Sequence, residues 1–233
     1  MCIRDRSGEE HINIKSCEER GIKCKFLPEP NSESAAEHTL MLMLNLLRNF
    51  SNSQTAIQSN KWKISYERGR DISETVFGII GYGRVGRRVS GALKSLGAEV
   101  ITFDPYVKDA GSDLDAVLAN SDLISLHVPS TEETAKLVDK NFISKMKAGT
   151  FIVNTSRGSV LCEEALLSAL KNNKIAGAAL DVFEKEPLTK DSQLRAEDLN
   201  IILTPHAGSW TETAFIKASQ RARAEIVSFF ESD

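Results

Sequence analysis

The strongest constraint on the fold is an alternation of two patterns between residues 76 and about 205. Short apolar runs rich in β-forming residues are mostly followed by stretches with the 3.6-residue period of an α-helix. Six strands are expected, at Val76–Gly81, Glu99–Asp104, Leu123–Val128, Thr150–Thr155, Gly177–Val182 and Asn200–Leu203. Near-continuous apolar strands that alternate with helices are typical of a parallel sheet covered on both faces. The sequence therefore predicts an α/β fold with a doubly wound parallel sheet.

Helical patterns account for the intervening and flanking segments. Two of them place their apolar residues on one face, with members Val85, Val89, Ala92, Leu93 and Leu96 in the first and Ala165, Leu166, Ala169 and Leu170 in the second. Two longer helices flank the alternating region. Each is predicted to open with a capping box, at residues 34–37 and 209–212, because a serine precedes a glutamate by three positions.

Composition and charge exclude several classes of protein. Of 233 residues, 41% are hydrophobic and 26% are charged, which is ordinary for a globular chain. A net charge of -3 argues against nucleic acid or an anionic membrane as a partner held by bulk charge. The longest apolar run, residues 40–47, is far shorter than the roughly 20 residues of a membrane span.

The four cysteines, Cys2, Cys17, Cys24 and Cys162, lie far apart and form no CxxC pair. Neither a zinc site nor a redox dithiol is therefore expected, and no metal is predicted. Scattered thiols in a chain of this size indicate a reducing compartment, so a cytoplasmic location is expected. Residues 1–7 match no pattern in the rest of the chain and are expected to be a non-native leader.

A glycine-rich turn gives the first functional signal. Gly81-Tyr82-Gly83-Arg84-Val85-Gly86 follows a predicted strand, opens a predicted helix, and precedes Asp104 at the end of the next strand. Gly81 would permit the tight turn, Gly83 the approach of a pyrophosphate, and Gly86 the packing of helix on strand. Asp104 would accept a hydrogen bond from the ribose 2′-OH and repel a 2′-phosphate, which favours NAD over NADP. The alternative is a structural glycine turn beside a solvated carboxylate.

Ionisable residues follow three of the predicted strands: Arg157, Glu186 and His206. Ligands of open parallel sheets bind beyond the carboxyl ends of the strands, so these side chains can converge there. A guanidinium can hold a carboxylate, a histidine can supply a proton, and a neighbouring carboxylate would keep that histidine protonated. This set fits hydride transfer to a 2-oxoacid, although each residue could instead be structural.

Other polar residues are weaker candidates. Asp181 ends a strand at the same edge and could bind the carboxamide of the cofactor, or could cap a helix. His11, His38 and His127 are interpreted as structural. The run at residues 40–47 is interpreted as helix core or as a contact between subunits.

With these motifs the chain resembles the D-isomer-specific 2-hydroxyacid dehydrogenases, with the phosphoglycerate and hydroxypyruvate types most similar. The resemblance runs from about Gly8 to the C-terminus, and the segments that carry it are residues 31–38, 78–86, 127–129, 154–158, 179–187 and 204–208. It implies catalytic roles for Arg157, Glu186 and His206. It also implies contacts with NAD from the glycine turn and from Arg84, Val85, Asp104, Val128, Pro129, Thr155, Ser156, Arg157, Asp181, His206, Ala207, Gly208 and Ser209.

The resemblance also implies a domain arrangement. In this family the nucleotide domain is inserted into the substrate domain, and two nucleotide domains commonly pair as a homodimer. We accordingly expect residues 1–30 to be a remnant of the substrate domain, residues 31–207 to form the dinucleotide-binding domain, and residues 208–233 to form a helix that returns to the substrate domain. Because the family has further substrate domain before the segment resembling Gly8–Asn13, the chain is expected to be N-terminally truncated.

Three readings of the function stay open. The leading one is an NAD-dependent oxidoreductase that acts on a D-2-hydroxyacid. The second is a dinucleotide-binding module or sensor of the same fold without turnover, or an inactive fragment in which cofactor binding survives better than catalysis. The third is a dehydrogenase of the same fold with another substrate, such as formate, against which the carboxylate of Glu186 argues because an uncharged partner for the histidine is expected there.

Overall fold

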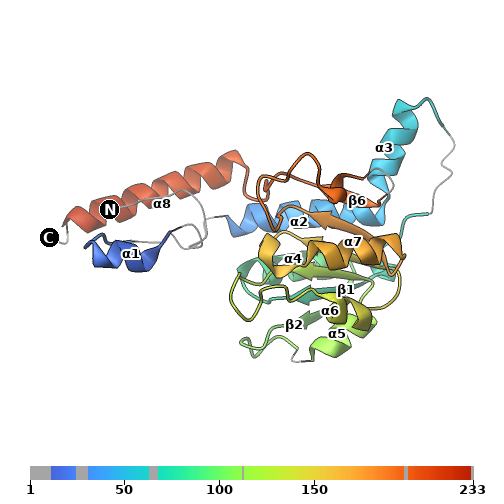
Figure 1. The fold of residues 1–233 in the computed structure, drawn as a ribbon, viewed down its shortest axis with the longest axis horizontal. Helices are drawn as coiled ribbons and strands as arrows, with labels where there is room; N and C mark the ends of the chain where they lie inside the picture. Colours follow the sequence, from blue (N-terminus) through green and yellow to red (C-terminus); the bar gives the residue numbers. More distant parts are fainter. Residues whose placement is uncertain (1–11, 25–30, 63–67, 112, 197–198, 232–233) are drawn as a thin grey trace. The chain divides into compact units, whose positions relative to one another are not determined.

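The computed structural model describes residues 12–24, 31–62, 68–111, 113–196 and 199–231 (Figure 1). The chain divides into two compact units. The larger unit consists of residues 36–208, and the smaller unit combines residues 1–35 with residues 209–233.

A six-stranded parallel sheet forms the centre of the larger unit, in the order β2-β1-β3-β4-β5-β6. The strands are β1 (Val76–Ile80), β2 (Glu99–Phe103), β3 (Leu123–Leu126), β4 (Thr150–Asn154), β5 (Ile175–Leu180) and β6 (Ile201–Leu203). All six predicted strands are confirmed, with ends that differ from the prediction by at most two residues. The strand order reverses between β1 and β3, and this reversal marks the edge where an open α/β sheet binds its ligand.

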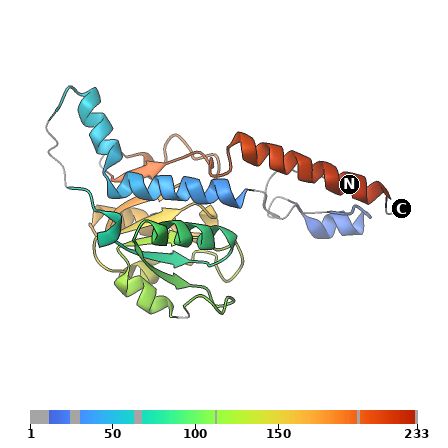
Figure 2. The same ribbon diagram turned by 180° about the vertical axis from the view of Figure 1, so that it is seen from behind.

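Alternate residues of each strand point to opposite faces of this sheet, and helices cover both faces. Phe77 and Ile79 of β1 pack with α2 (Ser32–Leu47) and α4 (Arg84–Ser95), which lie across the sheet in Figure 2. Ile80 belongs to the opposite cluster, which is covered by α5 (Leu114–Asn120), α6 (Lys140–Lys145) and α7 (Glu163–Lys171). The doubly wound fold is thereby confirmed.

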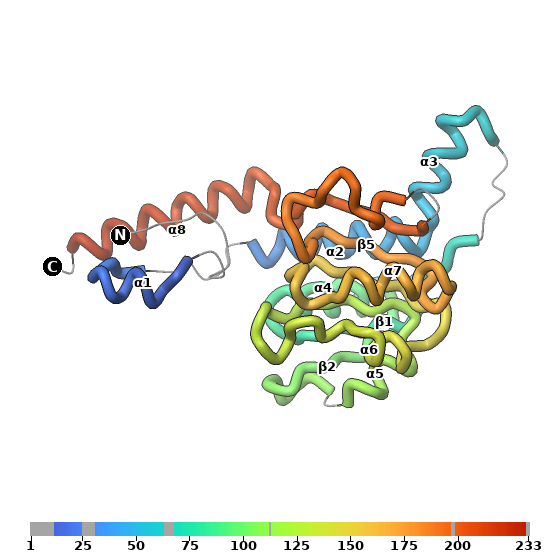
Figure 3. Tube along the Cα trace, in the orientation of Figure 1, coloured from blue at the N-terminus to red at the C-terminus, as the bar shows by residue number. Residues whose placement is uncertain are grey.

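Shorter elements complete the path of the chain, which Figure 3 traces. They are α3 (Phe50–Gln58), η1 (Ile72–Glu74), η2 (Gly158–Val160) and η3 (Gln193–Arg195). Among the described residues between β5 and β6, η3 is the only helical element. The loops after β4, β5 and β6 emerge at the same edge of the sheet, because neighbouring strands are parallel.

The predicted helix faces are largely correct. Ala165, Leu166, Ala169 and Leu170 of α7 are all buried. In α4, Val89 and Leu93 are buried, but Leu96 is the residue that follows the helix and is 56% exposed. The prediction for Leu96 was wrong because the helix ends one residue earlier, so the helical period no longer sets the direction of this side chain.

Both predicted capping boxes are displaced from the true helix starts. Helix α2 begins at Ser32, so Ser34 lies inside its first turn, where its Oγ bonds the Thr211 Oγ1 at 2.9 Å. An acidic residue at Glu33 suits the first turn, because helix N-termini carry a partial positive charge. Helix α8 (Glu212–Glu231) begins after Thr211, whose Oγ1 accepts the Ala214 N–H at 3.1 Å, so the cap is Thr211 and not Ser209.

The smaller unit contains α1 (Ile14–Glu19), the first turn of α2, and α8. Gly21, just after α1, has a φ of 66°, in the left-handed region that glycine adopts readily. The Lys217 ammonium lies 2.5 Å from the Glu33 carboxylate, which joins α8 to the first turn of α2. The suspected leader, residues 1–7, lies entirely outside the described residues.

Candidate active site

The glycine turn connects β1 to α4, and its three glycines sit in three different environments. Gly81 has a φ of 92°, and a Cβ there would lie 2.5 Å from the His127 carbonyl oxygen. A Cβ on Gly86 would collide with the Gly81 carbonyl oxygen, so both positions require glycine. A Cβ on Gly83 would meet nothing within 4 Å, which leaves that face of the turn open.

The start of α4 is suited to an anion. Its N-cap is Gly83, which has no side chain to cap the first turn, and Arg84 and Val85 are the first helical residues. Backbone N–H groups at a helix start, an open glycine face and an adjacent guanidinium form the kind of cradle that a pyrophosphate occupies. The residues present therefore fit a dinucleotide, and Gly81, Gly83 and Gly86 have the geometry that their predicted roles need.

Asp104 follows β2 and turns its carboxylate toward the glycine turn. Its Oδ2 accepts the Tyr82 N–H at 2.8 Å, and its Oδ1 accepts the Tyr106 N–H at 3.0 Å. Tyr82 belongs to the turn itself, so the carboxylate is fixed directly beside it. This is the placement that the predicted ribose contact requires, while the contact with ribose stays a prediction.

The end of β3 lies on the other side of the turn. Val128 and Pro129 follow this strand, and the Val128 backbone approaches Gly81 closely. His127 bonds the Ser125 Oγ through Nε2 at 3.0 Å. Burial lowers the pKa of His127 to about 4, so this imidazole is neutral at pH 7. Its environment agrees with the structural role expected for it.

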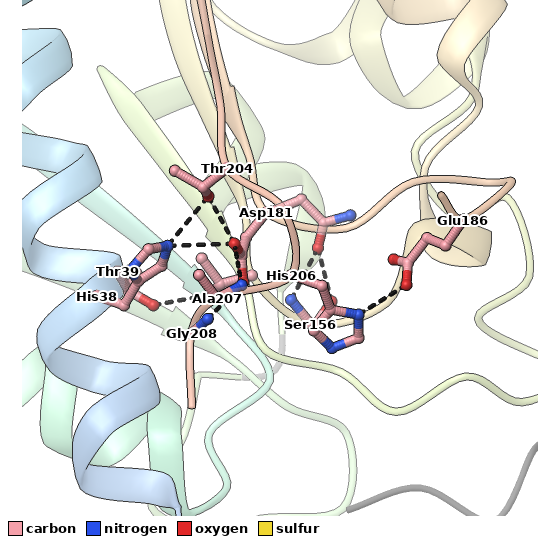
Figure 4. Close-up of polar contacts among 11 residues, drawn as sticks. His38, Thr39, Ser156, Asp181, Glu186, Thr204, His206, Ala207 and Gly208 are labelled. Atoms are coloured by element: carbon pink, nitrogen blue, oxygen red, sulfur yellow. Dashed lines mark hydrogen bonds and ion pairs between the residues drawn. The ribbon is translucent and has the colours of Figure 1, made fainter. Parts of the chain in front are cut away.

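A histidine–carboxylate pair lies at the carboxyl edge of β5 and β6. The His206 Nδ1 is 2.7 Å from the Glu186 Oε2 (Figure 4). The other carboxylate oxygen of Glu186 accepts the Phe183 N–H at 3.1 Å, so both oxygens are engaged. Since Nδ1 faces the carboxylate, Nε2 is the ring nitrogen that can exchange a proton with a substrate. The structure thus brings together two of the three residues predicted to be catalytic.

The backbone that carries His206 is held in an unusual conformation. His206 has a φ of 54°, in the left-handed region that non-glycine residues seldom adopt. Its N–H donates to the Asp181 carbonyl oxygen at 2.8 Å. The Asp181 side chain accepts two further N–H groups from the same turn, with Ala207 at 2.8 Å on Oδ1 and Gly208 at 2.8 Å on Oδ2.

Asp181 itself is 1% exposed. Burial acts to raise the pKa of Asp181, but hydrogen bonds outweigh burial and lower it below its usual value; the donors are His38, Thr204, Ala207 and Gly208. The carboxylate is therefore ionised at neutral pH. Three of the four donors lie against Oδ1, and the Gly208 N–H bonds Oδ2. The alternative role, a helix cap, is not what the structure shows, because the N–H groups that the Asp181 side chain accepts belong to the loop after β6. Its predicted contact with the cofactor stays a prediction.

Two residues of α2 that the sequence did not mark as part of a site reach these strand ends. The His38 Nε2 lies 3.2 Å from the Asp181 Oδ1 and 3.1 Å from the Thr204 Oγ1. The Thr39 Oγ1 bonds the Thr155 Oγ1, at the end of β4, at 2.7 Å. The available signal was a pair of polar residues directly before the apolar run at residues 40–47.

Arg157 lies in the loop after β4, and buried Asn154 shapes this loop. The Asn154 Nδ2 donates to the Arg157 carbonyl at 3.0 Å, and its Oδ1 accepts the Ser156 N–H at 3.0 Å. The Arg157 Nη1 donates to the Ser156 carbonyl at 2.8 Å. A Cβ on Gly158 would collide with the Phe183 carbonyl, so the loops after β4 and β5 are in direct contact. Asn154 was missed because it ends an otherwise apolar strand.

A second contact ties the loop that carries Glu186 to α7. The Glu163 N–H donates to the Glu184 Oε1 at 2.9 Å, and the Glu184 N–H donates to the Glu163 Oε1 at 2.8 Å. Burial, together with the nearby Glu184 charge, raises the pKa of Glu163 above its usual value. Because Cys162 at the N-cap makes no side-chain cap bond, Glu184 supplies an acceptor to the helix start.

The sequence of the chain is similar to those of known dehydrogenases. Residues 40–208 match the family model described as D-isomer specific 2-hydroxyacid dehydrogenase, NAD binding domain. The chain is 36% identical over 227 residues to the D-3-phosphoglycerate dehydrogenase of Synechocystis sp., covering 94% of this chain and 41% of that protein. It is 34% identical to the hydroxypyruvate reductase of Thermotoga maritima, covering 94% of this chain and 72% of that protein.

Solved structures with a similar fold include dehydrogenases that act on D-2-hydroxyacids. The D-lactate dehydrogenase of Aquifex aeolicus, solved with NAD and lactic acid, superposes with a TM-score of 0.89 at 30% identity and covers 98% of this chain and 75% of that one. The fold and the glycine turn define a dinucleotide-binding domain. The chain belongs to the D-isomer-specific 2-hydroxyacid dehydrogenase family, and NAD is the cofactor of its matched domain. It spans about two fifths of the length of the phosphoglycerate dehydrogenases that it matches.

No helix within the described ranges is long and apolar enough to cross a membrane.

Proposed function

We propose that this chain forms the catalytic NAD-binding part of an oxidoreductase that interconverts a D-2-hydroxyacid and its 2-oxoacid. The observation that carries the proposal is the 2.7 Å contact between His206 and Glu186, at the strand edge that also bears the glycine turn. A domain that only senses a dinucleotide has no need for an acid–base pair there. The family membership favours a phosphoglycerate or hydroxypyruvate type of substrate.

In this proposal the cofactor supplies or accepts the hydride, and the protein manages charge and protons. Arg157 releases the Ser156 carbonyl and holds the substrate carboxylate, for which its planar guanidinium is suited. His206 donates a proton from Nε2 to the carbonyl oxygen as that oxygen becomes an alcohol. Glu186 holds Nδ1 and stabilises the positive charge of the imidazolium until the proton has been transferred.

The test is turnover of a panel of 2-oxoacids with NADH by the wild-type chain and three variants. Replacing the imidazole (His206→Ala) should lower kcat by roughly 10²- to 10⁴-fold, the usual contribution of a general acid. Glu186→Gln should also lower kcat, whereas Glu164→Gln, an exposed carboxylate on α7, should not. The affinity for NADH, measured by fluorescence, should change little in all three. Wild-type chain that binds NADH without turnover would instead support the sensor or fragment reading.

We also propose that the smaller unit belongs to a substrate domain and that two copies of the chain pair as a homodimer. Four apolar side chains of α2 and α3 in the larger unit support the pairing, since each is between 39% and 58% exposed: Met41, Leu44, Phe50 and Ile57. Sedimentation should give a dimer, and Met41→Glu combined with Leu44→Glu should give a monomer. A cytoplasmic location is proposed as well, because cysteines scattered along a chain of this size are typical of a reducing compartment.

A further inference from the structure

His38 contributes a largely buried polar group to a helix whose other buried residues are mostly apolar. Its side chain on α2 is 13% exposed, and helix residues near it such as Leu42 and Met43 are fully buried against the sheet. A polar group that is withdrawn from water costs free energy unless it finds a hydrogen-bond partner. His38 finds two partners, Asp181 and Thr204, on the loops after β5 and β6 (Figure 4).

The direction of these hydrogen bonds follows from the number of available protons. Asp181 is ionised and can only accept. Thr204 has one hydroxyl proton, which it donates to the Asp181 Oδ1 at 2.6 Å. The His38 Nε2 lies within hydrogen-bond distance of both oxygens, so it must carry a proton and act as the donor. His38 and Thr204 together therefore fix the position of Oδ1.

Asp181 passes this constraint to the turn that carries His206. Oδ1 also accepts the Ala207 N–H, Oδ2 accepts the Gly208 N–H, and the backbone carbonyl accepts the N–H of His206 itself. Three successive N–H groups thus converge on one residue. Left-handed backbone is strained at a non-glycine residue, so it persists only where the surrounding contacts impose it.

We propose that His38 is a positioning residue: through Asp181 it holds the left-handed turn that places the His206 imidazole against Glu186. The role rests on the proposed function, since it matters for catalysis only if His206 transfers a proton. It assigns to α2, which is distant in sequence from the catalytic residues, the task of setting the geometry of the acid–base pair.

The experiment compares two substitutions of similar length. His38→Gln keeps an N–H donor near the position of Nε2, whereas His38→Met removes the donor and retains the apolar bulk. Hydrogen–deuterium exchange of the whole chain is measured for a peptide that covers the amides of residues 206–208 and for one that covers β1. His38→Met should speed exchange at residues 206–208 by about tenfold or more and leave β1 unchanged, and His38→Gln should stay close to wild type. Glu37→Gln, an exposed neighbour on the same helix, is the matched control.

Three results would overturn the proposal: unchanged exchange at residues 206–208 in His38→Met, an equal rise in β1, which would indicate general destabilisation, or equal damage from His38→Gln. Turnover provides the second measurement. His38→Met should lower kcat by roughly 10- to 100-fold, as a slightly misplaced catalytic group does, with little change in NADH affinity. If the wild-type chain shows no turnover while the exchange pattern is as expected, the proposed function fails and the positioning of the turn stands.

Discussion

Asp104 has both carboxylate oxygens held by backbone N–H groups, one from the glycine turn and one from Tyr106. A carboxylate fixed in this way cannot turn aside to admit a second anion. We therefore predict that the choice between NAD and NADP depends, at the residue scale, on this one side chain, since a repulsive element of this kind is a common source of specificity.

Replacing this side chain (Asp104→Ala) should weaken NADH binding by roughly 10- to 100-fold, since a hydrogen bond to a charged group contributes about 1.5–3 kcal/mol. Binding of NADPH should improve, because the charge that repels the 2′-phosphate is gone. Fluorescence titration with both cofactors measures the two effects. Asp109→Ala is the control, because Asp109 is an exposed carboxylate paired with Arg87 and lies, like Asp104, between β2 and α5. Equal effects of both substitutions would contradict the ribose contact.

At the element scale, helix starts in this fold obtain their hydrogen-bond acceptors in different ways. The N-caps of α5 and α6 are Asp113 and Asp139, whose Oδ1 atoms accept an N–H of the first turn at 3.0 and 2.8 Å. The α7 helix instead has Cys162 at its N-cap and takes its acceptor from Glu184, in the loop after β5. A local cap and a cap from a distant segment thus serve the same need.

Loss of a local cap should destabilise the larger unit. Asp139→Ala should lower the free energy of unfolding by about 0.5–2 kcal/mol, because the Phe142 N–H loses its partner. Asp139→Asn should be nearly neutral, since asparagine caps helices equally well. Urea unfolding followed by circular dichroism measures both values. A deficit of the same size in the asparagine variant would show that charge, and not the hydrogen bond, stabilises α6.

At the scale of the whole molecule, the titration of His127 should make stability depend on pH. Its pKa in the folded chain is about 4, lowered by burial from about 6.5. Between these values the unfolded chain binds a proton that the folded chain does not, so stability falls as the pH falls below 6.5. The loss from this residue should be about 2 kcal/mol between pH 7 and pH 5. Urea unfolding at the two pH values should show this loss in the wild-type chain and not in His127→Asn; equal losses in both would remove His127 as the cause.

Two carboxylates, Asp122 and Asp181, should affect the stability of the fold in a lower pH range. The pKa of Asp122 is lowered, because its hydrogen bonds and the Lys147 and Arg70 charges outweigh the effect of burial, and the pKa of Asp181 is lowered in the same sense. These groups stabilise the fold above their unfolded pKa near 4, and their contribution is lost as the pH falls through the lower folded values. Acid unfolding should therefore begin with His127 and continue with these carboxylates.

Much of the fold could be predicted because it depends on local patterns. Short apolar runs rich in β-forming residues identified all six strands, since strands buried on both faces need nearly continuous apolar residues. The glycine turn was recognisable for a similar reason: a positive φ at Gly81 and the close contact at Gly86 permit only glycine. Local pattern was less accurate at the helix starts, where several adjacent residues are able to cap and only packing selects one of them.

By itself, the sequence determined the parallel sheet and the glycine turn, because each depends on residue type at short spacing. It also predicted Glu186 and His206 as catalytic residues, through the resemblance of their motifs to those of the family. Only the tertiary structure decided that Glu186 contacts His206 through Nδ1, that Asp181 gathers the N–H groups of the His206 turn, and that His38 supports Asp181 from α2. These contacts join residues 20 to more than 100 positions apart, and no local pattern specifies them. The contact with His38 forms because burial of α2 against the sheet brings this polar side chain to strand ends that carry polar groups of their own.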